Sequence, residues 1–208
     1  MIEVADKQVA DKQVASNFYF DRVHNNQAVK LLPGEYYVTS KDLLLVTVLG
    51  SCVAACIRDS VSGIGGMNHF MLPDAGQDEN GPINASARYG TYAMEVLINE
   101  LLKLGARRAN LEAKVFGGGN VLSGLTIANV GERNAKFVLE FLEMENIRVV
   151  AKDLVDIYPR KVYFFPKNSK VMVKKLKSTH NDTISKREKD YSKRLGNAKP
   201  SGDIELFS

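Results

Sequence analysis

This chain of 208 residues contains no tryptophan, two cysteines and six prolines. Two cysteines are too few for the disulfide framework of a small secreted domain. The longest uncharged stretch, residues 43–57, is interrupted by Gly50 and Ser51 and is too short to span a bilayer. The first residues are acidic and lack the basic and apolar regions of a signal peptide. We therefore expect a cytoplasmic protein without membrane insertion, in which both cysteines stay reduced.

The net charge of +4 is unevenly distributed along the chain. Residues 170–199 contain ten Lys and Arg against three acidic residues, a local net charge of +7. Such a segment can contact nucleic acid or anionic lipid. This one has Tyr191 as its only aromatic residue and no repeated basic motif. The pattern favours a solvated, partly disordered tail over a nucleic-acid-binding arm, and we expect no nucleic-acid partner.

The composition allows one well-packed core, because 45% of the residues are hydrophobic and the chain is short for two full domains. Residues 4–8 recur at 9–13 as a tandem duplication in a stretch with little to bury. We predict a mobile N-terminal extension over 1–16, one folded domain over 17–177, and a basic, partly disordered tail over 178–208.

Periodicity places two amphipathic helices among several strands. The expected helices are 87–104 and 132–145, and the expected strands are 36–39, 43–49, 111–116 and 147–151, with hairpins formed by 51–58 with 64–72 and by 161–165 with 170–176. Strands joined by hairpins favour an α/β layered sandwich with mixed or antiparallel sheets over a doubly wound parallel sheet. The glycines at 117–119 lack the spacing of a phosphate loop or dinucleotide fingerprint, and a tight turn is the better interpretation.

Cys52 and His69 are the pair most indicative of chemistry. If residues 59–62 form the turn of the central hairpin, Cys52 faces His69 directly. Residues so paired have Cβ atoms about 4.5–5.5 Å apart. A histidine beside a cysteine can take the thiol proton and leave the thiolate, which attacks carbonyl carbons. Such a neighbour lowers the pKa of the cysteine thiol. The pair therefore predicts a thiol hydrolase with sulfur and an imidazole nitrogen within about 4 Å.

A different register weakens this interpretation. A five-residue turn would pair Cys52 with Phe70 and put His69 on the other face of the sheet. Cys52 would then be a small buried apolar residue and His69 a satisfied core histidine. The dipeptide Gly50-Ser51 favours the catalytic alternative, because it interrupts a strand-like run where a backbone would bend to expose a nucleophile.

A metal site at the cysteines is not expected. Cys52 and Cys56 would lie about 13 Å apart on a strand that rises about 3.3 Å per residue. His69 is the only further soft ligand near them in the sequence, whereas structural zinc takes four such ligands. We predict neither a metal nor an organic cofactor.

Residues 49–56 (LGSCVAAC) and 65–73 (GGMNHFMLP) closely resemble the motifs of the CheD family of chemoreceptor glutamine deamidases. Further matches, in the family's order, are residues 33–36, 88–90, 112–118, 130–134 and 201–207. The resemblance covers about residues 18–177 and the C-terminal end. It implies an α/β sandwich related to the catalytic domain of the deamidating bacterial necrotizing toxins.

The resemblance also implies an activity and its residues. CheD proteins deamidate glutamines on the cytoplasmic helices of methyl-accepting chemotaxis receptors, and some also hydrolyse receptor methyl esters. It implies Cys52 as the nucleophile, His69 as the general base and Thr47 as the residue that orients His69. Backbone amides near Gly50 and Ser51 are expected to bind the oxyanion.

Two departures from the family pattern affect these expectations. Thr47 lies five residues before Cys52, so strand alternation would put it on the opposite face unless Gly50-Ser51 forms a bulge. The glycine-rich segment that usually follows the late aspartate is missing after Asp153. The loop at 154–159 therefore has no expected conformation.

A binding module is the alternative class. The chain would then dock on receptors or on a CheC-type phosphatase without catalysis. The presence of both Cys52 and His69 argues for an enzyme.

Overall fold

The computed structural model describes residues 14–72, 85–120, 130–176 and 181–197. Ten strands form two five-stranded sheets. In spatial order the first sheet consists of β1 (Asn17–Asp21), β2 (Asn26–Leu31), β4 (Leu44–Leu49), β9 (Arg160–Phe165) and β10 (Lys170–Lys175). The second consists of β3 (Tyr36–Thr39), β6 (Gly65–Asn68), β5 (Val53–Asp59), β7 (Leu111–Gly117) and β8 (Arg148–Leu154). The described helices are α2 (Ala85–Lys103), α3 (Val130–Met144) and α4 (Asn181–Asn197), with two short 3₁₀ turns, η1 (Arg108–Asn110) and η2 (Pro166–Asn168).

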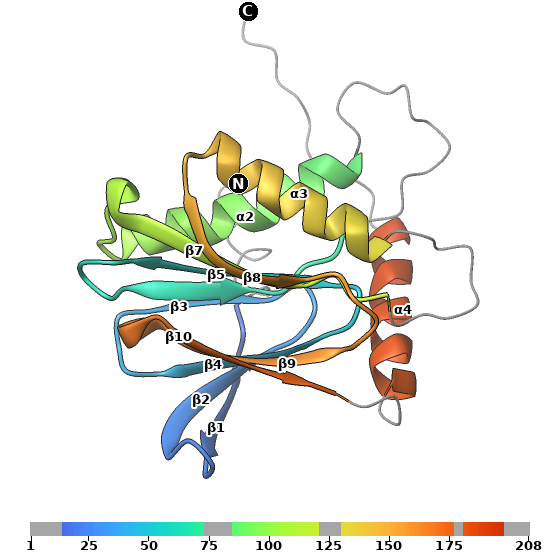
Figure 1. The fold of residues 1–208 in the computed structure, drawn as a ribbon, viewed down its shortest axis with the longest axis horizontal. Helices are drawn as coiled ribbons and strands as arrows, with labels where there is room; N and C mark the ends of the chain where they lie inside the picture. The colour runs from blue at the N-terminus through green and yellow to red at the C-terminus, as the bar shows by residue number, and fades with distance from the viewer. Residues whose placement is uncertain (1–13, 73–84, 121–129, 177–180, 198–208) are drawn as a thin grey trace, which may run out of the picture.

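The two sheets and two of the helices form three layers. In Figure 1, α2 and α3 cover the outer face of the second sheet, and the first sheet packs against its inner face. Strand β5 lies between the helices and the first sheet, and both of its faces are apolar. Val53, Ala55 and Ile57 pack in the cluster beneath the helices, whereas Ala54 and Cys56 pack in the cluster between the sheets. Because side chains alternate between the two faces of a strand, β5 contributes to both hydrophobic cores.

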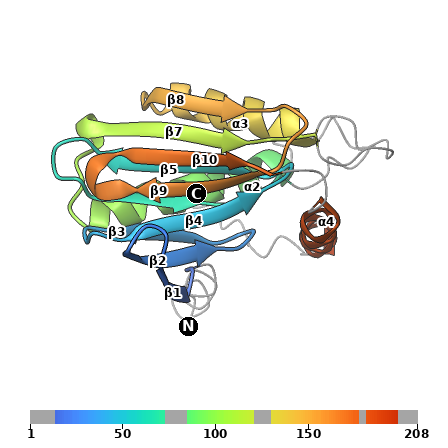
Figure 2. The same ribbon diagram turned by 60° about the horizontal axis from the view of Figure 1, so that its bottom comes forward.

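Helix α4 stands apart from α2 and α3. It runs across one end of the stacked sheets, beside the end of β4 (Figures 1 and 2). It lies in the segment 178–208, for which the composition predicted a solvated tail. Residues 1–13, with the duplication, lie outside the described residues, as do the loop at 73–82 and the family match at 201–207. The three-part domain division stays a prediction.

The α/β layered sandwich with mixed sheets is confirmed. The predicted helices and strands are also found, with ends within a few residues of those expected. A relation to the necrotizing toxins stays a prediction. Among the helices in the described part of the chain, none has the length and apolar character needed to cross a membrane.

The predicted register of the central hairpin is wrong. Arg58 pairs with Gly65, and Val53 forms a bridge with Phe70. The turn begins one residue later than expected, because the Asp59 N–H donates to the Ile64 carbonyl at 2.8 Å and the Asp59 carboxylate accepts hydrogen bonds from the N–H groups of Val61 and Ser62. This register excludes both the predicted turn at 59–62 and the five-residue alternative. The register differs from the first prediction by two residues, and an even shift keeps Cys52 and His69 on the same face.

Candidate active site

The chain crosses from one sheet to the other at Gly50-Ser51. Strand β4 of the first sheet ends at Leu49, and β5 of the second sheet begins at Val53. Strand alternation therefore does not relate Thr47 to Cys52, because they belong to different sheets that face each other. All three predicted side chains are buried, with exposed fractions of 0% for Thr47, 0% for Cys52 and 1% for His69.

Thr47 contacts His69 directly, through a distance of 2.7 Å between Oγ1 and Nδ1. The same hydroxyl donates its proton to the Leu31 carbonyl oxygen at 2.9 Å. Since a hydroxyl has one proton, Oγ1 must accept from His69, and we assign the tautomer with hydrogen on Nδ1. The lone pair of Nε2 is then free to act as a base. Nε2 is buried and makes no hydrogen bond to any described residue.

Cys52 and His69 are brought together with a third residue, Glu188 of α4. The Cys52 sulfur, a His69 ring nitrogen and a Glu188 carboxylate oxygen lie within 4.8 Å of one another. The sequence predicted the first two members of this group and missed the third. The catalytic roles assigned to Thr47, Cys52 and His69 stay predictions, as does a separation of about 4 Å between sulfur and imidazole nitrogen, but the structure brings the three side chains together.

The electrostatics differ from the prediction of a thiolate. Burial raises the pKa of the Cys52 thiol well above its ordinary value, and the Glu188 carboxylate raises it further. Burial lowers the pKa of His69 to about 4, although Glu188 partly offsets this effect. The expected lowering of the cysteine pKa is therefore wrong for this arrangement. At neutral pH the pair consists of a neutral thiol and a neutral imidazole.

The Glu188 carboxylate is held by an anion site, which consists of three consecutive backbone N–H groups and one hydroxyl. Oε1 accepts from the N–H of Gly50 at 2.8 Å and of Cys52 at 3.2 Å. Oε2 accepts from the N–H of Ser51 at 2.9 Å and from the Ser51 hydroxyl at 2.7 Å. Successive N–H groups that converge in this way form a binding site for anions. Gly50 and Ser51 thus donate to an anionic oxygen, while their predicted role as oxyanion donors in a reaction stays a prediction.

The carbonyl groups of the same three residues are held on the other side of the turn. The bonds are Gly119 N to Gly50 O at 2.7 Å, Asn134 Nδ2 to Ser51 O at 2.8 Å, and Gly118 N to Cys52 O at 2.8 Å. A peptide group is planar, so fixing the carbonyl of one residue also fixes the direction of the next residue's N–H. The bonds to the Gly50 and Ser51 carbonyls therefore preorganise the Ser51 and Cys52 N–H groups without involving the anion.

Asn134 of α3 links two segments of the site. Its Nδ2 donates to the Ser51 carbonyl, and its Oδ1 accepts from the Leu72 N–H at 2.9 Å. The side chain is fully buried. It belongs to the family match at 130–134, but the sequence alone assigned it no role. Its bonds make it a positioning residue for the nucleophile turn.

The glycines after β7 allow this close approach. Gly117 and Gly118 have φ angles of 110° and 66°, which favour glycine. A Cβ atom on Gly117 would collide with the Cys52 carbonyl oxygen. The tight turn expected at 117–119 is confirmed, and its function is to support the turn that carries Cys52.

The loop that departs from the family pattern is held by a buried arginine. Arg160 donates to Asp153 Oδ1 at 3.0 and 3.1 Å and to the Tyr158 carbonyl at 3.1 Å. The Asn120 N–H donates to the Asp156 carbonyl at 2.7 Å, which ties this loop to the segment after Gly119. The loop therefore lies behind the glycine turn rather than over the nucleophile.

Helix α4 presents a narrow buried face to the site. Ile184, Glu188 and Tyr191 are buried and Leu195 is partly buried, a spacing that places them on one side of the helix. The Tyr191 hydroxyl hydrogen-bonds the hydroxyl of Tyr89. The sequence signal for this buried face was the helical spacing of three apolar residues around Glu188. The many charged residues in the same segment concealed this spacing.

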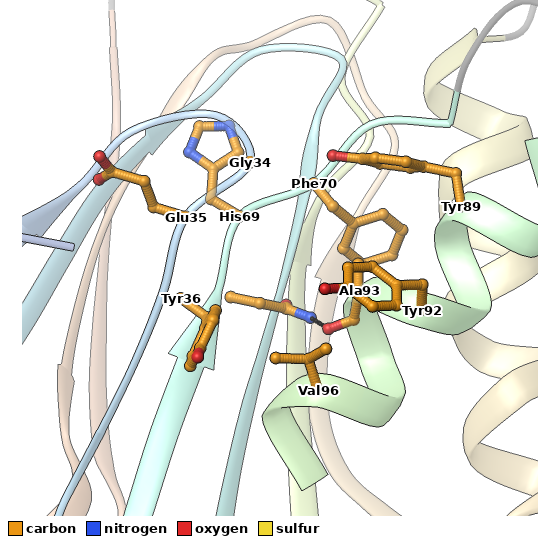
Figure 3. A pocket seen from close by; sticks show the side chains of 10 residues that line it. Gly34, Glu35, Tyr36, His69, Phe70, Tyr89, Tyr92, Ala93 and Val96 are labelled. Atoms are coloured by element: carbon orange, nitrogen blue, oxygen red, sulfur yellow. Dashed lines mark hydrogen bonds between the residues drawn. The ribbon is translucent and has the colours of Figure 1, made fainter. Parts of the chain in front are cut away.

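A small pocket lies beside His69, between the segment around β3 and helix α2. Its lining includes Glu35, His69 and Tyr89. In Figure 3 the Tyr89 hydroxyl is directed toward the His69 side of the pocket. Tyr89 belongs to the family match at 88–90, and the structure places it as a further side chain at the edge of the site.

Cys52, His69 and Glu188 are also residue types that bind metals. A carboxylate offers about four lone-pair positions. Four donors of the anion site already contact the Glu188 oxygens. The N–H groups would also repel a cation at this point. The arrangement fits an anionic oxygen rather than a metal ion.

Comparisons with known proteins identify the family to which the chain is similar. The model of the family described as "CheD chemotactic sensory transduction" matches residues 71–175. A protein of Janthinobacterium sp. (strain Marseille), named a probable chemoreceptor glutamine deamidase CheD, is 65% identical over 97% of this chain and 99% of its own length. Proteins with the same name are 66% identical in Herminiimonas arsenicoxydans, over 93% of this chain and 96% of the relative, and 51% identical in Ralstonia nicotianae (strain ATCC BAA-1114 / GMI1000), over 96% and 87%. The chain belongs to the CheD family.

Proposed function

We propose that this protein deamidates glutamine side chains on the cytoplasmic helices of methyl-accepting chemotaxis receptors and acts in the cytoplasm. The names of its relatives support the substrate class. The observation that carries the chemistry is the anion site beside Cys52. Three N–H groups converge there on the carboxylate of a glutamate, which is the product of glutamine deamidation.

The first chemical step forms a thioester. His69 Nε2 takes the thiol proton while the Cys52 sulfur attacks the amide carbon of the substrate glutamine. The carbonyl oxygen becomes an oxyanion, and the N–H groups at 50–52 stabilise it. The imidazolium then gives its proton to the amide nitrogen, the C–N bond breaks and ammonia leaves.

The second step releases glutamate. His69 takes a proton from water, the resulting hydroxide attacks the thioester carbon, and the same anion site holds the second oxyanion. The C–S bond breaks, and the proton held by His69 returns to the Cys52 sulfur. Thr47 keeps Nδ1 protonated throughout, so that Nε2 faces the reaction. Neither step needs a redox partner.

The anion site is expected to supply a large part of the rate enhancement. Removal of a single oxyanion donor costs about 2.7–4 kcal/mol in a well-studied hydrolase. Donors that are already oriented need no reorganisation when charge develops. The bonds from Gly119 and Asn134 orient the Ser51 and Cys52 N–H groups in this way.

Ammonia release from a purified receptor fragment that carries glutamines tests the proposal. We expect ammonia in equal amount to the glutamates that mass spectrometry detects, and none with Cys52→Ala. A fragment that binds the protein while its glutamines stay unchanged would contradict the enzyme and favour the adaptor alternative. Methyl-ester cleavage and docking on a CheC-type phosphatase stay predictions, which the same assay can test with an esterified fragment and with the added phosphatase.

A further inference from the structure

Helix α4 places a glutamate side chain where the proposed reaction would leave its product. We propose that α4 is a tethered product analogue, which closes the active site and shows how a glutamine-bearing helix docks there. The inference rests on the proposed function. It concerns a segment of this chain rather than the receptor, and it gives the enzyme an internal competitor for its substrate.

Helix α4 occludes the nucleophile and the base. With α4 in place the nucleophile and the base have almost no exposed surface. The Glu188 carboxylate occupies all four donors of the anion site. A substrate glutamine therefore cannot reach Cys52 until Glu188 leaves. The same carboxylate disfavours the thiolate, since two negative charges would lie side by side.

The anion site is chemically complementary to a carboxylate. Both oxygens of a carboxylate accept hydrogen bonds, whereas a glutamine amide has one accepting oxygen and a donating NH₂ group. The anion site offers two donors to each oxygen of Glu188. A glutamine in the same place would turn its NH₂ toward one pair of these donors. The site therefore binds the acid better than the amide, as expected for groups that stabilise an oxyanion.

The spacing of side chains on α4 indicates how a substrate helix would dock. Ile184, Tyr191 and Leu195 lie four residues before, three after and seven after Glu188, and they pack on the protein with it. Tyr191 covers Gly34 and hydrogen-bonds Tyr89. A docked substrate helix would use the same contacts. We infer that it carries apolar side chains at −4 and +7 and a large side chain at +3 relative to its glutamine.

The tether makes this competition effective. Only residues 176–180 separate β10 from α4. A ligand joined to its site by a short linker acts at an effective concentration on the order of millimolar. A receptor helix must then bind strongly or at high local density to displace α4. The resting enzyme would be held inactive away from its substrate.

Glu188→Gln tests the geometry, because it places a glutamine at the catalytic position. We expect the introduced glutamine in the purified full-length protein to be converted back to glutamate, as peptide mass spectrometry would show. Adding Cys52→Ala should preserve the glutamine. Lys189→Gln is the matched control: it adds a glutamine to the exposed face of the same helix, and this glutamine should remain.

The outcomes separate the two proposals. If the glutamine of Glu188→Gln persists in a protein that deamidates a receptor fragment, α4 does not dock as a substrate and the inference is overturned. If neither that glutamine nor the receptor fragment is converted, the proposed function itself fails. Conversion of the glutamine in Lys189→Gln as well would mean non-specific deamidation, which also contradicts the docking geometry.

Occlusion is tested independently of turnover by alkylation of Cys52 with iodoacetamide. The double variant Glu188→Ala/Tyr191→Ala should loosen α4 and speed both alkylation of Cys52 and deamidation of a receptor fragment. Lys189→Ala/Lys193→Ala, on the exposed face, should match the unmodified protein. Cys56, which is buried four residues farther along the chain in β5, reports any general unfolding. Equal alkylation of Cys52 in all three proteins would overturn the occlusion.

Discussion

The sandwich and helix α4 meet at one carboxylate, but they are held there in different ways. On the sandwich side, the nucleophile turn is fixed by three backbone carbonyl bonds and lies between two sheets. On the other side, the contacts of α4 include the Glu188 carboxylate, the Tyr191 hydroxyl and the side chains of Ile184 and Leu195. Elements with few buried contacts open at lower free energy than the core. The sandwich should stay formed when α4 leaves.

This difference predicts opposite effects of substitutions on the two sides. Changes in the sandwich remove groups that the reaction needs, so they should lower activity. Changes on the buried face of α4 remove a competitor, so they should raise it. A variant that breaks this rule would show that the two regions form one unit.

Replacement of the nucleophile should have the largest effect. Cys52→Ala should reduce deamidation of a receptor fragment by more than about 10³-fold, because no other group can form the thioester. Cys56→Ala is the matched control: it is equally buried and faces the same inter-sheet core, but it has no role in the reaction. Urea unfolding should show that each variant loses only about 1 kcal/mol. Equal loss of activity in both would refute a single nucleophile.

Loss of the histidine's partner should have the next largest effect. Thr47→Val keeps the shape but leaves Nδ1 without an acceptor and the Leu31 carbonyl without its donor. We expect kcat to fall, by less than the roughly 10²–10⁴-fold that a general acid–base group contributes. Thr47→Ser keeps the hydroxyl and should retain most of the activity. If valine and serine behaved alike, the hydroxyl would have no part in orienting His69.

Asn134→Ala tests whether the anion site depends on its support. The substitution frees the Ser51 carbonyl and the Leu72 N–H. We expect kcat to fall about 10-fold, less than the 10²–10³-fold loss of a direct oxyanion donor, with little change in KM. Stability should fall by about 1–3 kcal/mol, since buried polar groups lose their partners. Lys136→Ala, on the exposed face of α3, should change neither.

The sequence predicted most of the sandwich because local patterns decide it. Amphipathic periodicity located α2 and α3, and apolar runs located β4 and β5. The register of the hairpin could not be predicted, because Asp59 extends the strand by one residue and its side chain caps a turn that begins after it. The prediction that Cys52 and His69 share a face survived because the error was an even number of residues.

The rest of the site depends on contacts between distant segments. Thr47 of β4 reaches His69, directly after β6, because β4 and β6 belong to different sheets, which strand alternation within one chain segment does not describe. Glu188 lies 136 residues from Cys52 and comes from a segment whose charge favoured a solvated tail. The helical spacing of its apolar neighbours can be read from the sequence. The surface on which these side chains pack cannot, because distant segments form it.

The smallest effect concerns the pKa of His69, which belongs to the sandwich but responds to α4. Burial lowers this pKa from 6.5 to about 4, and the Glu188 carboxylate acts in the opposite direction. In Glu188→Ala the pKa should therefore fall further, whereas Lys189→Ala should leave it unchanged. NMR titration of the His69 ring protons measures the midpoint directly. A rise in Glu188→Ala would mean that water entering the site outweighs the lost negative charge.

The lowered pKa of His69 also determines how the stability of the protein changes with pH. Between pH 6.5 and about 4 the unfolded chain binds a proton at His69 and the folded protein does not. The contribution of neutral His69 to the free energy of unfolding is therefore fully present above pH 6.5, and it is lost as the pH falls toward 4. Urea unfolding at pH 7 and pH 5 should show this loss, and His69→Asn should reduce it. Because removal of Glu188 lowers the folded pKa, Glu188→Ala should widen the pH range over which stability is lost.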